Sequence, residues 1–308
     1  MEFTEDAILR LLATVDNVPK PIGQIVRSGE GGEHLVWVID DAFVLRIRAD
    51  GQDDTLLRRE EAILAFLKSL EHKSTIIPTC LGIGVLDDDE RRPYGLYRKV
   101  AGVSIESSPH SVNATTEEDL ARMLLLLRRA STDSVRGLGL PDAEPADLSE
   151  LRRRALNAWQ RLTSDNGRLG GTLARGVDIG QALRLPESAV NSSRPHERPV
   201  LVHADLKGEH VFVDPNTGHL TGVIDWSDAC VGHPSVDIHG LAISVGAAAA
   251  SRIARRAGYD DGDAVVARGA FTARCDSIIR LDAILHGNDD SPEWLVRLQL
   301  ERALEPVQ

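Results

Sequence analysis

Short apolar stretches separated by turns dominate the first hundred residues. In one of them Phe43, Leu45 and Ile47 fall on one face of an extended chain, and the Asp-Asp pair before it predicts the turn of a β-hairpin. The predicted strands cover residues 35–39, 43–48, 80–86 and 94–100, and the predicted helices cover residues 6–15 and 55–70. This part of the sequence therefore predicts a small antiparallel sheet with one main helix.

After residue 100 the apolar spacing becomes helical. A Thr-Thr-Glu-Glu sequence at residues 115–118 predicts a capping box, and the apolar positions behind it follow a helical period. A second helix is predicted over residues 149–162, short strands lie between residues 199 and 226, and the rest of the chain is helical. We therefore predict an α+β fold with two domains, residues 1–100 and 101–308, the second larger and mainly helical.

Composition narrows the classes of protein. The 308 residues include 35 Lys and Arg against 47 Asp and Glu, so the net charge is −12, and 42% of the residues are hydrophobic. This hydrophobic content excludes a disordered chain, and the acidic balance argues against nucleic-acid or anionic-membrane binding. No basic and apolar leader is visible, and three scattered cysteines support neither a disulfide framework nor a zinc site. We expect a cytoplasmic protein.

The segment from residue 201 to residue 237 carries the most informative pattern. An apolar run leads to Asp205 in a loop, His210 follows five residues later, and a hairpin return ends at Asp225. Any one of these residues alone is a common loop, cap or turn residue. Because Asp205, His210 and Asp225 occur together, in this order, within a strand-turn-strand pattern, we expect them to meet at one end of neighbouring strands. Two carboxylates and an imidazole so placed suit phosphoryl transfer, in which one group orients the attacking hydroxyl and others hold a divalent cation.

The sequences His203-Ala204-Asp205, His210 and Ile224-Asp225-Trp226 resemble the catalytic signature of the aminoglycoside phosphotransferase family, which includes macrolide phosphotransferases. The resemblance implies a protein-kinase-like bilobal fold with Asp205 as catalytic base and Asp225 as metal ligand. His210 lies where aminoglycoside kinases carry Asn, and a His at this position is more similar to the macrolide kinases. It is expected to be either a metal ligand or a hydrogen-bonding residue without metal contact. His203 and Asp237 are expected to support the catalytic loop. The cation is expected to be magnesium (Mg²⁺), with manganese (Mn²⁺) possible because imidazole nitrogen is a softer ligand.

The first region adds nucleotide-binding candidates under the same resemblance. Ser28, Gly29, Gly31 and Gly32 precede the hairpin, where kinases place a phosphate-covering loop, although a plain β-turn fits as well. Arg46 lies where kinases carry a phosphate-binding Lys and Glu60 where they carry its partner; the alternative is a solvated strand face. The adenine or guanine ring is expected to bind backbone groups from Tyr97 to Lys99.

Three positions depart from the family pattern. Arg46 replaces a Lys and adds bidentate geometry toward phosphate or Glu60. Ala204 replaces a Gly, which is tolerable if its backbone has negative φ. His233 replaces the Asp of a Gly-Asp-Pro sequence, which leaves the role of that Asp open.

The expected function is a small-molecule kinase that transfers the γ-phosphoryl of ATP or GTP to a hydroxyl of a macrolide-like or aminoglycoside-like antibiotic. The acceptor is expected to carry an amine. Several acidic residues of the second region could offer it negative charge, and the alternative is that they form solvated helix faces: Asp228, Asp276, Asp282, Asp289 and Asp290. The alternatives are a housekeeping kinase for choline, homoserine or a sugar, and a nucleotide-binding pseudokinase. The acceptor, the donor base, the hydroxyl attacked and the oligomeric state are not encoded in a readable pattern.

Overall fold

The structure is a computed structural model in which two compact units are distinguished. It describes residues 5–15, 18, 20–28, 34–48, 53–70, 76–86, 91–108, 112–164, 178–185, 198–259, 264–287 and 291–307. The first unit comprises Met1–Ala101 and Thr221–Ser227, and the second comprises Gly102–Leu220 and Asp228–Gln308. The segment Thr221–Ser227, which the sequence placed with the second region, therefore groups with the first, and it brings Asp225 with it.

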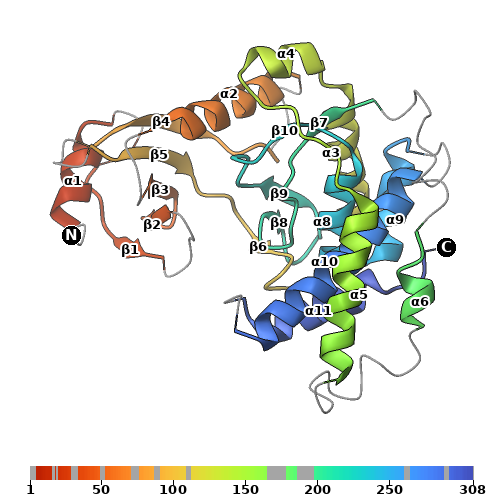
Figure 1. Ribbon diagram of the computed structural model, residues 1–308. Helices are drawn as coiled ribbons and strands as arrows, with labels where there is room; N and C mark the ends of the chain where they lie inside the picture. Colours follow the sequence, from red (N-terminus) through yellow and green to blue (C-terminus); the bar gives the residue numbers. More distant parts are fainter. Residues whose placement is uncertain are drawn as a thin grey trace. The chain divides into compact units, whose positions relative to one another are not determined.

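The first unit is built on a five-stranded antiparallel sheet in the order β1-β2-β3-β5-β4 (Figure 1). The strands are β1 (Ile25–Arg27), β2 (His34–Ile39), β3 (Phe43–Arg48), β4 (Cys80–Val85) and β5 (Pro93–Arg98), and the helices are α1 (Glu5–Ala13) and α2 (Thr55–Leu70). Phe43, Leu45 and Ile47 are buried on one face of β3, as their alternation predicts. The turn before β3 places Asp40 and Asp41 at φ 50° and 51°, a conformation that Asp tolerates in tight hairpins.

The register across this sheet sets the neighbours of Arg46. On β3, Arg46 pairs with Val36 of β2 on one side and with Gly95 of β5 on the other. On α2, Glu60 is buried together with the apolar face of the helix. A buried charged residue needs ion-pair or hydrogen-bond partners. The partners of Glu60 form part of the candidate site.

The second unit is mainly helical. Its helices are α3 (Ala114–Arg129), α4 (Thr132–Gly137), α5 (Leu148–Ser164), α6 (Ile179–Ala182), α8 (Ser235–Val245), α9 (Ala247–Arg256), α10 (Ala264–Leu285) and α11 (Glu293–Ala303). Its strands are β6 (Val103–Ser104), β7 (Val200–Val202), β8 (Val211–Val213) and β10 (Cys230–Gly232); β6 pairs with β8 and β7 with β10. Strand β9 (Leu220–Val223) begins at the last residue of the range Gly102–Leu220 and leads into the segment that carries Asp225.

The start of α3 differs from the prediction. Asn113, not a Thr, is the N-cap: its side chain accepts the N–H groups of Thr115 and Thr116, and the Thr116 hydroxyl accepts the N–H of Asn113. The predicted capping box at residues 115–118 is therefore wrong by two residues. Asn is a strong N-cap residue, and Thr at the third helical position replaces the Glu that the motif usually carries.

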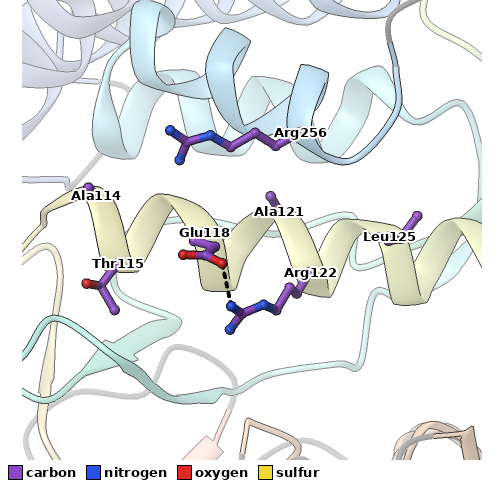
Figure 2. A pocket seen from close by; sticks show the side chains of 7 residues that line it. All are labelled: Ala114, Thr115, Glu118, Ala121, Arg122, Leu125 and Arg256. Carbon is purple, nitrogen blue, oxygen red and sulfur yellow. Dashed lines mark hydrogen bonds and ion pairs between the residues drawn. The ribbon is translucent and has the colours of Figure 1, made fainter.

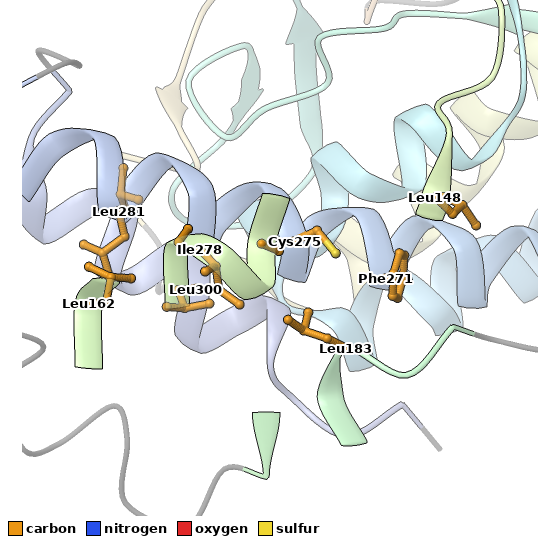
Figure 3. Close-up of a cluster of buried hydrophobic side chains, with 11 residues drawn as sticks. Leu148, Leu162, Leu183, Phe271, Cys275, Ile278, Leu281 and Leu300 are labelled. Atoms are coloured by element: carbon orange, nitrogen blue, oxygen red, sulfur yellow. The ribbon is translucent and has the colours of Figure 1, made fainter. Parts of the chain in front are cut away.

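The core of the second unit lies around α10. Leu281, Ile278, Cys275 and Phe271 follow one another along this helix and pack against Leu148 and other buried side chains (Figure 3). Two glycines allow α8 to pack closely against its neighbours. A Cβ at Gly240 would lie 2.4 Å from the carbonyl oxygen of Leu206, and a Cβ at Gly269 of α10 would lie 2.7 Å from the Ile238 side chain. Helix α8 therefore packs directly against the loop that carries Asp205.

Two general features complete the description. Within the described ranges, no helix combines the length and apolar character needed to cross a membrane. Cys80, Cys230 and Cys275 carry free thiols.

Candidate active site

The loop after β7 is held by two buried side chains. Asp237, in the first turn of α8, accepts the His203 N–H at 3.1 Å and the Ala204 N–H at 3.0 Å with its two carboxylate oxygens. Burial raises the pKa of Asp237 to about 6, although the two backbone hydrogen bonds act in the opposite direction. The fully buried His203 accepts the Asp205 N–H at 3.3 Å with Nδ1. Three consecutive N–H groups of the loop are thus bound before any ligand is present.

Ala204 adopts a left-handed backbone conformation, with φ 68°. The condition under which alanine would be tolerable here, a negative φ, is therefore not met. A Cβ is strained in this region, and the bond from the Ala204 N–H to Asp237 holds the residue there.

Replacing Ala204 with Gly is expected to raise the free energy of unfolding by about 0.5–1 kcal/mol, because removal of the Cβ relieves strain and the freer unfolded chain offsets part of the gain. Urea unfolding measures this change. The control Ala283→Gly, in α10, is expected to change stability in the opposite direction by about 1 kcal/mol, since its backbone is helical. A loss of stability in both variants would contradict the strain assigned to Ala204.

Asp205 has a cationic neighbour that the sequence reasoning missed. Lys207 Nζ lies 2.9 Å from Asp205 Oδ1 and 3.5 Å from Glu209 Oε1. Burial lowers the pKa of Lys207, but the charge of Asp205 and its hydrogen bond raise it more, so the ammonium stays charged. The only signal in the sequence is a lysine two residues after the expected base. That spacing alone does not tell whether the side chain turns toward the carboxylate.

His210 is oriented by the same loop. Its Nδ1 lies 2.8 Å from the carbonyl oxygen of Asp205, and since a carbonyl only accepts, this nitrogen carries the proton. In the neutral imidazole Nε2 then has its lone pair, and Nε2 lies 3.8 Å from Glu209 Oε1. This tautomer suits a metal ligand as well as a hydrogen-bond acceptor, so both alternatives for His210 stay predictions.

In the first unit, Arg46 bridges two carboxylates. Its Nη1 lies 3.1 Å from Glu60 Oε1, and its Nη2 lies 3.1 Å from Asp225 Oδ1. Burial alone would lower the pKa of Arg46, but Glu60 and Asp225 raise it more, so the guanidinium stays charged. One cation between two carboxylates leaves one excess negative charge, which suits a divalent cation. Asp225 has a left-handed backbone at φ 63°, and its Oδ1 also accepts the Ser227 hydroxyl at 2.9 Å.

The expected metal ligands fit the chemistry of Mg²⁺ only in part. In the described part of the chain, no group of three or more His, Cys, Asp or Glu residues could hold a metal ion by itself. Mg²⁺ commonly takes one or two carboxylates and completes its shell with water and substrate phosphates. Asp225, with a carboxylate that is one-third exposed, is compatible with that role.

The other nucleotide-binding candidates stay predictions, and the structure describes only some of them. Gly29, Gly31 and Gly32 lie outside the described residues, and the Ser28 N–H donates to the Val36 carbonyl at 2.9 Å. The Lys99 N–H donates to the Ala42 carbonyl at 2.8 Å, and the Lys99 side chain pairs with Asp41. One of the backbone groups in the range considered for the base, the Lys99 N–H, is therefore already bonded within the first unit.

The Tyr97 backbone stays a candidate for the base, and its side chain makes a separate contact. Its hydroxyl donates to Glu60 Oε2 at 2.8 Å, and its side chain is buried. It therefore belongs to the Arg46–Glu60 network, which the sequence pattern did not indicate.

His233, which departs from the family pattern, binds at the start of α8. Its Nδ1 accepts the N–H of Ser235, the first residue of the helix, at 3.2 Å and lies 2.7 Å from the Ser235 hydroxyl. It therefore satisfies an N–H group of the first helical turn, close to Asp237 in sequence.

Of the five acidic residues considered for an acceptor amine, three lie in the described part of the chain, and one of these, Asp228, is exposed. Asp282 is buried and pairs with Arg161, so its charge is already balanced in the structure. Asp276 is 41% exposed, and its Oδ2 lies 3.6 Å from His239 Nε2. Asp289 and Asp290 lie outside the described residues.

A hollow of about 550 Å³ on α3 and α9 contains none of these residues (Figure 2). Arg122, on its wall, pairs with Glu118, and Arg256 pairs with Glu117. Its cations are therefore balanced by neighbouring carboxylates, and the candidate chemistry lies elsewhere.

A model described as the phosphotransferase enzyme family (APH) matches residues 24–271 of the chain. The chain belongs to this phosphotransferase family. The predicted family is thereby confirmed, and the closer likeness of the His210 loop to macrolide phosphotransferases stays a prediction. Viomycin phosphotransferase of Streptomyces vinaceus is 25% identical over 190 residues, and the match covers 60% of this chain and 61% of that protein. The chain thus spans less than two thirds of this relative's length.

Solved structures share the fold of this phosphotransferase family member along nearly the whole chain. The GDP complex of wild-type aminoglycoside 2'-phosphotransferase-IIIa has a TM-score of 0.66 at 20% identity and covers 97% of this chain and 96% of its own. Macrolide 2'-phosphotransferase type I has a TM-score of 0.57 at 18% identity and covers 98% of both chains. The predicted α+β fold, an antiparallel sheet region followed by a mainly helical region, is confirmed.

Proposed function

We propose that this member of the phosphotransferase family transfers the γ-phosphoryl of ATP or GTP to a hydroxyl of a small antibiotic. The observation that carries the proposal is the preorganised loop in which Asp205 lies against Lys207 at 2.9 Å and is anchored by Asp237 and His203. The loop that carries this carboxylate is therefore already in place before the substrates bind.

In the proposed reaction the acceptor oxygen attacks the γ-phosphorus, its proton moves to the Asp205 carboxylate, and the bond to the bridging β-phosphate oxygen breaks. Lys207 balances the charge of Asp205 before the proton arrives and that of the phosphoryl oxygens during transfer. Because Lys207 is already in contact with Asp205, the second unit supplies both the proton acceptor and a compensating cation.

The first unit supplies the proposed triphosphate contacts. Arg46 is the residue proposed to bind phosphate, and the buried Glu60 keeps its guanidinium in place. Asp225 is the candidate of this unit that would hold Mg²⁺, and the metal would neutralise phosphate oxygens when bound. His210, in the second unit, stays a separate candidate ligand. Ser28, in the predicted phosphate-covering loop, and the backbone from Tyr97 to Lys99 remain candidates for the nucleotide site.

The acceptor class is supported by the names of similar proteins. Viomycin phosphotransferase, aminoglycoside phosphotransferases and a macrolide phosphotransferase act on antibiotics by their names, and several structural neighbours are complexes with GDP, ADP or ATP. Within the second unit, the half-exposed Asp276 offers a negative charge to an amine-bearing acceptor. A metabolite kinase for choline, homoserine or a sugar remains the alternative. The cytoplasmic location stays a prediction.

A direct assay tests this function. The purified full chain is incubated with ATP or GTP and with Mg²⁺ or Mn²⁺, in the presence of viomycin, an aminoglycoside, a macrolide, choline or homoserine. We expect one antibiotic to gain the mass of a single phosphoryl group. Phosphorylation of choline or homoserine alone would favour the metabolic alternative, and nucleotide binding without any product would favour the pseudokinase.

A further inference from the structure

Glu60 is held by donors from three different parts of the first unit. Arg46 Nη1 reaches both carboxylate oxygens, at 3.1 and 3.3 Å, and Tyr97 donates its hydroxyl to Oε2 at 2.8 Å. The Trp226 N–H approaches Oε1 at 3.4 Å. Burial raises the pKa of Tyr97 well above its ordinary value, so its hydroxyl keeps the proton that it donates. Of these contacts to Glu60, the one from Tyr97 is the shortest.

A glycine on the same strand makes the Tyr97 contact possible. Gly95 lies two residues before Tyr97 on β5, hence on the same face of the sheet. A Cβ at Gly95 would lie 2.7 Å from Cε2 and 2.8 Å from the hydroxyl oxygen of Tyr97. Any other residue would therefore displace the ring. Since Gly95 is the register partner of Arg46, the ring lies over the position facing Arg46, and the guanidinium carbon is 5.9 Å from the ring centroid.

The arrangement has a consequence specific to arginine. The guanidinium is planar, so the direction in which Nη1 meets Glu60 also fixes the direction of Nη2, which lies 3.1 Å from Asp225. A lysine would present a single nitrogen without such coupling. If Glu60 turned, the face of Arg46 presented to other ligands would turn with it.

We propose that Tyr97 is a positioning residue for nucleotide binding: through Glu60 its hydroxyl sets the orientation of Arg46, and Gly95 provides the space for its ring. This inference rests on the proposed phosphate-binding role of Arg46. Tyr97 contacts neither phosphate nor acceptor in this role, and it acts only through the carboxylate.

The variant Tyr97→Phe tests the proposal in the full chain. A hydrogen bond to a charged group is lost, so we expect nucleotide affinity, measured by calorimetric titration with ADP and Mg²⁺, to fall roughly tenfold. The KM for the nucleoside triphosphate should rise by a similar factor while kcat at saturating nucleotide changes little. Tyr94→Phe is the matched control, because it removes the same hydroxyl from the same strand, away from Glu60, and should change neither value.

A double-mutant cycle separates positioning from a structural effect. If Tyr97 acts through Glu60, the double variant Glu60→Gln, Tyr97→Phe should bind nucleotide no more weakly than Glu60→Gln alone. Gly95→Ala, in which the hydroxyl is present but the ring is displaced, should weaken binding as Tyr97→Phe does. Unchanged affinity in Tyr97→Phe, or fully additive losses in the cycle, would overturn the inference. Failure of the proposed function would instead appear in the wild type, as an absence of nucleotide binding or as binding without phosphorylation of an antibiotic.

Discussion

Replacing Asp205 with Asn is expected to lower turnover by roughly 10²–10⁴-fold while leaving nucleotide affinity nearly unchanged. The amide keeps the shape of the side chain but cannot take the proton of the attacking hydroxyl. The loop should keep its conformation, because the anchoring bonds of Asp237 and His203 involve backbone N–H groups and not the Asp205 side chain. Single-turnover transfer and calorimetric nucleotide binding, measured on the same preparation, separate the two effects.

Asp214→Asn provides the control in the same segment. The Asp214 carboxylate accepts hydrogen bonds from turn residues, the Asn216 and Thr217 N–H groups among them, which an amide oxygen can also do. We expect its turnover to match the wild type. Turnover of Asp205→Asn within about tenfold of the wild type would remove the general base from the proposed reaction, whatever the phenotype of the control.

Residue spacing together with the family resemblance indicated the main contacts of the candidate site. The hairpin places Arg46 on β3, and the helical period of α2 then predicts Glu60 on the buried face, where the two side chains meet. The family resemblance likewise indicated Asp237 as the support of the loop, and its two contacts are of that kind. The buried face on which Glu60 lies follows from the helical period, whereas its pairing with Arg46 and the role of Asp237 came from the resemblance.

Other features of the site depend on information that spacing does not hold. The positive φ of Ala204 was missed because alanine gives no signal for a left-handed backbone. The contacts of Lys207 and Tyr97 depend on which way a long side chain turns, and that choice is made by tertiary neighbours such as Gly95. Strand β1 has only three residues, two of them exposed, so its sequence carries little apolar alternation.

Removal of the Asp237 carboxylate is expected to have the largest effect on stability. In Asp237→Ala the buried N–H group of His203 and the partly buried N–H group of Ala204 both lose their acceptor, which costs about 2–4 kcal/mol of the free energy of unfolding. Asp237→Asn keeps one acceptor oxygen but directs an N–H₂ group at the other donor, so a loss of about 1–3 kcal/mol is expected. Activity should fall in both, since the loop that carries Asp205 is no longer fixed.

Asp133→Asn is the matched control for stability. The Asp133 side chain is 95% exposed and pairs only with Arg136 in the described contacts, so we expect a change within about 0.5 kcal/mol. Urea unfolding of the three variants and the wild type, with activity measured in parallel, compares them. Equal stability of Asp237→Asn and Asp133→Asn would contradict the anchoring role.

The pH dependence of this difference tests the charge of Asp237. An ordinary aspartate titrates near 3.8, whereas burial raises the pKa of Asp237 to about 6 in the folded chain. Between these values the folded protein keeps a proton that the unfolded chain has lost. The contribution of this group to stability is therefore complete below the unfolded value and is lost as the pH rises through about 6. Asn does not titrate, so the stability advantage of the wild type over Asp237→Asn should shrink from about pH 4 to about pH 7. An advantage that grows over this range would mean that the two N–H bonds outweigh burial and hold the carboxylate charged throughout.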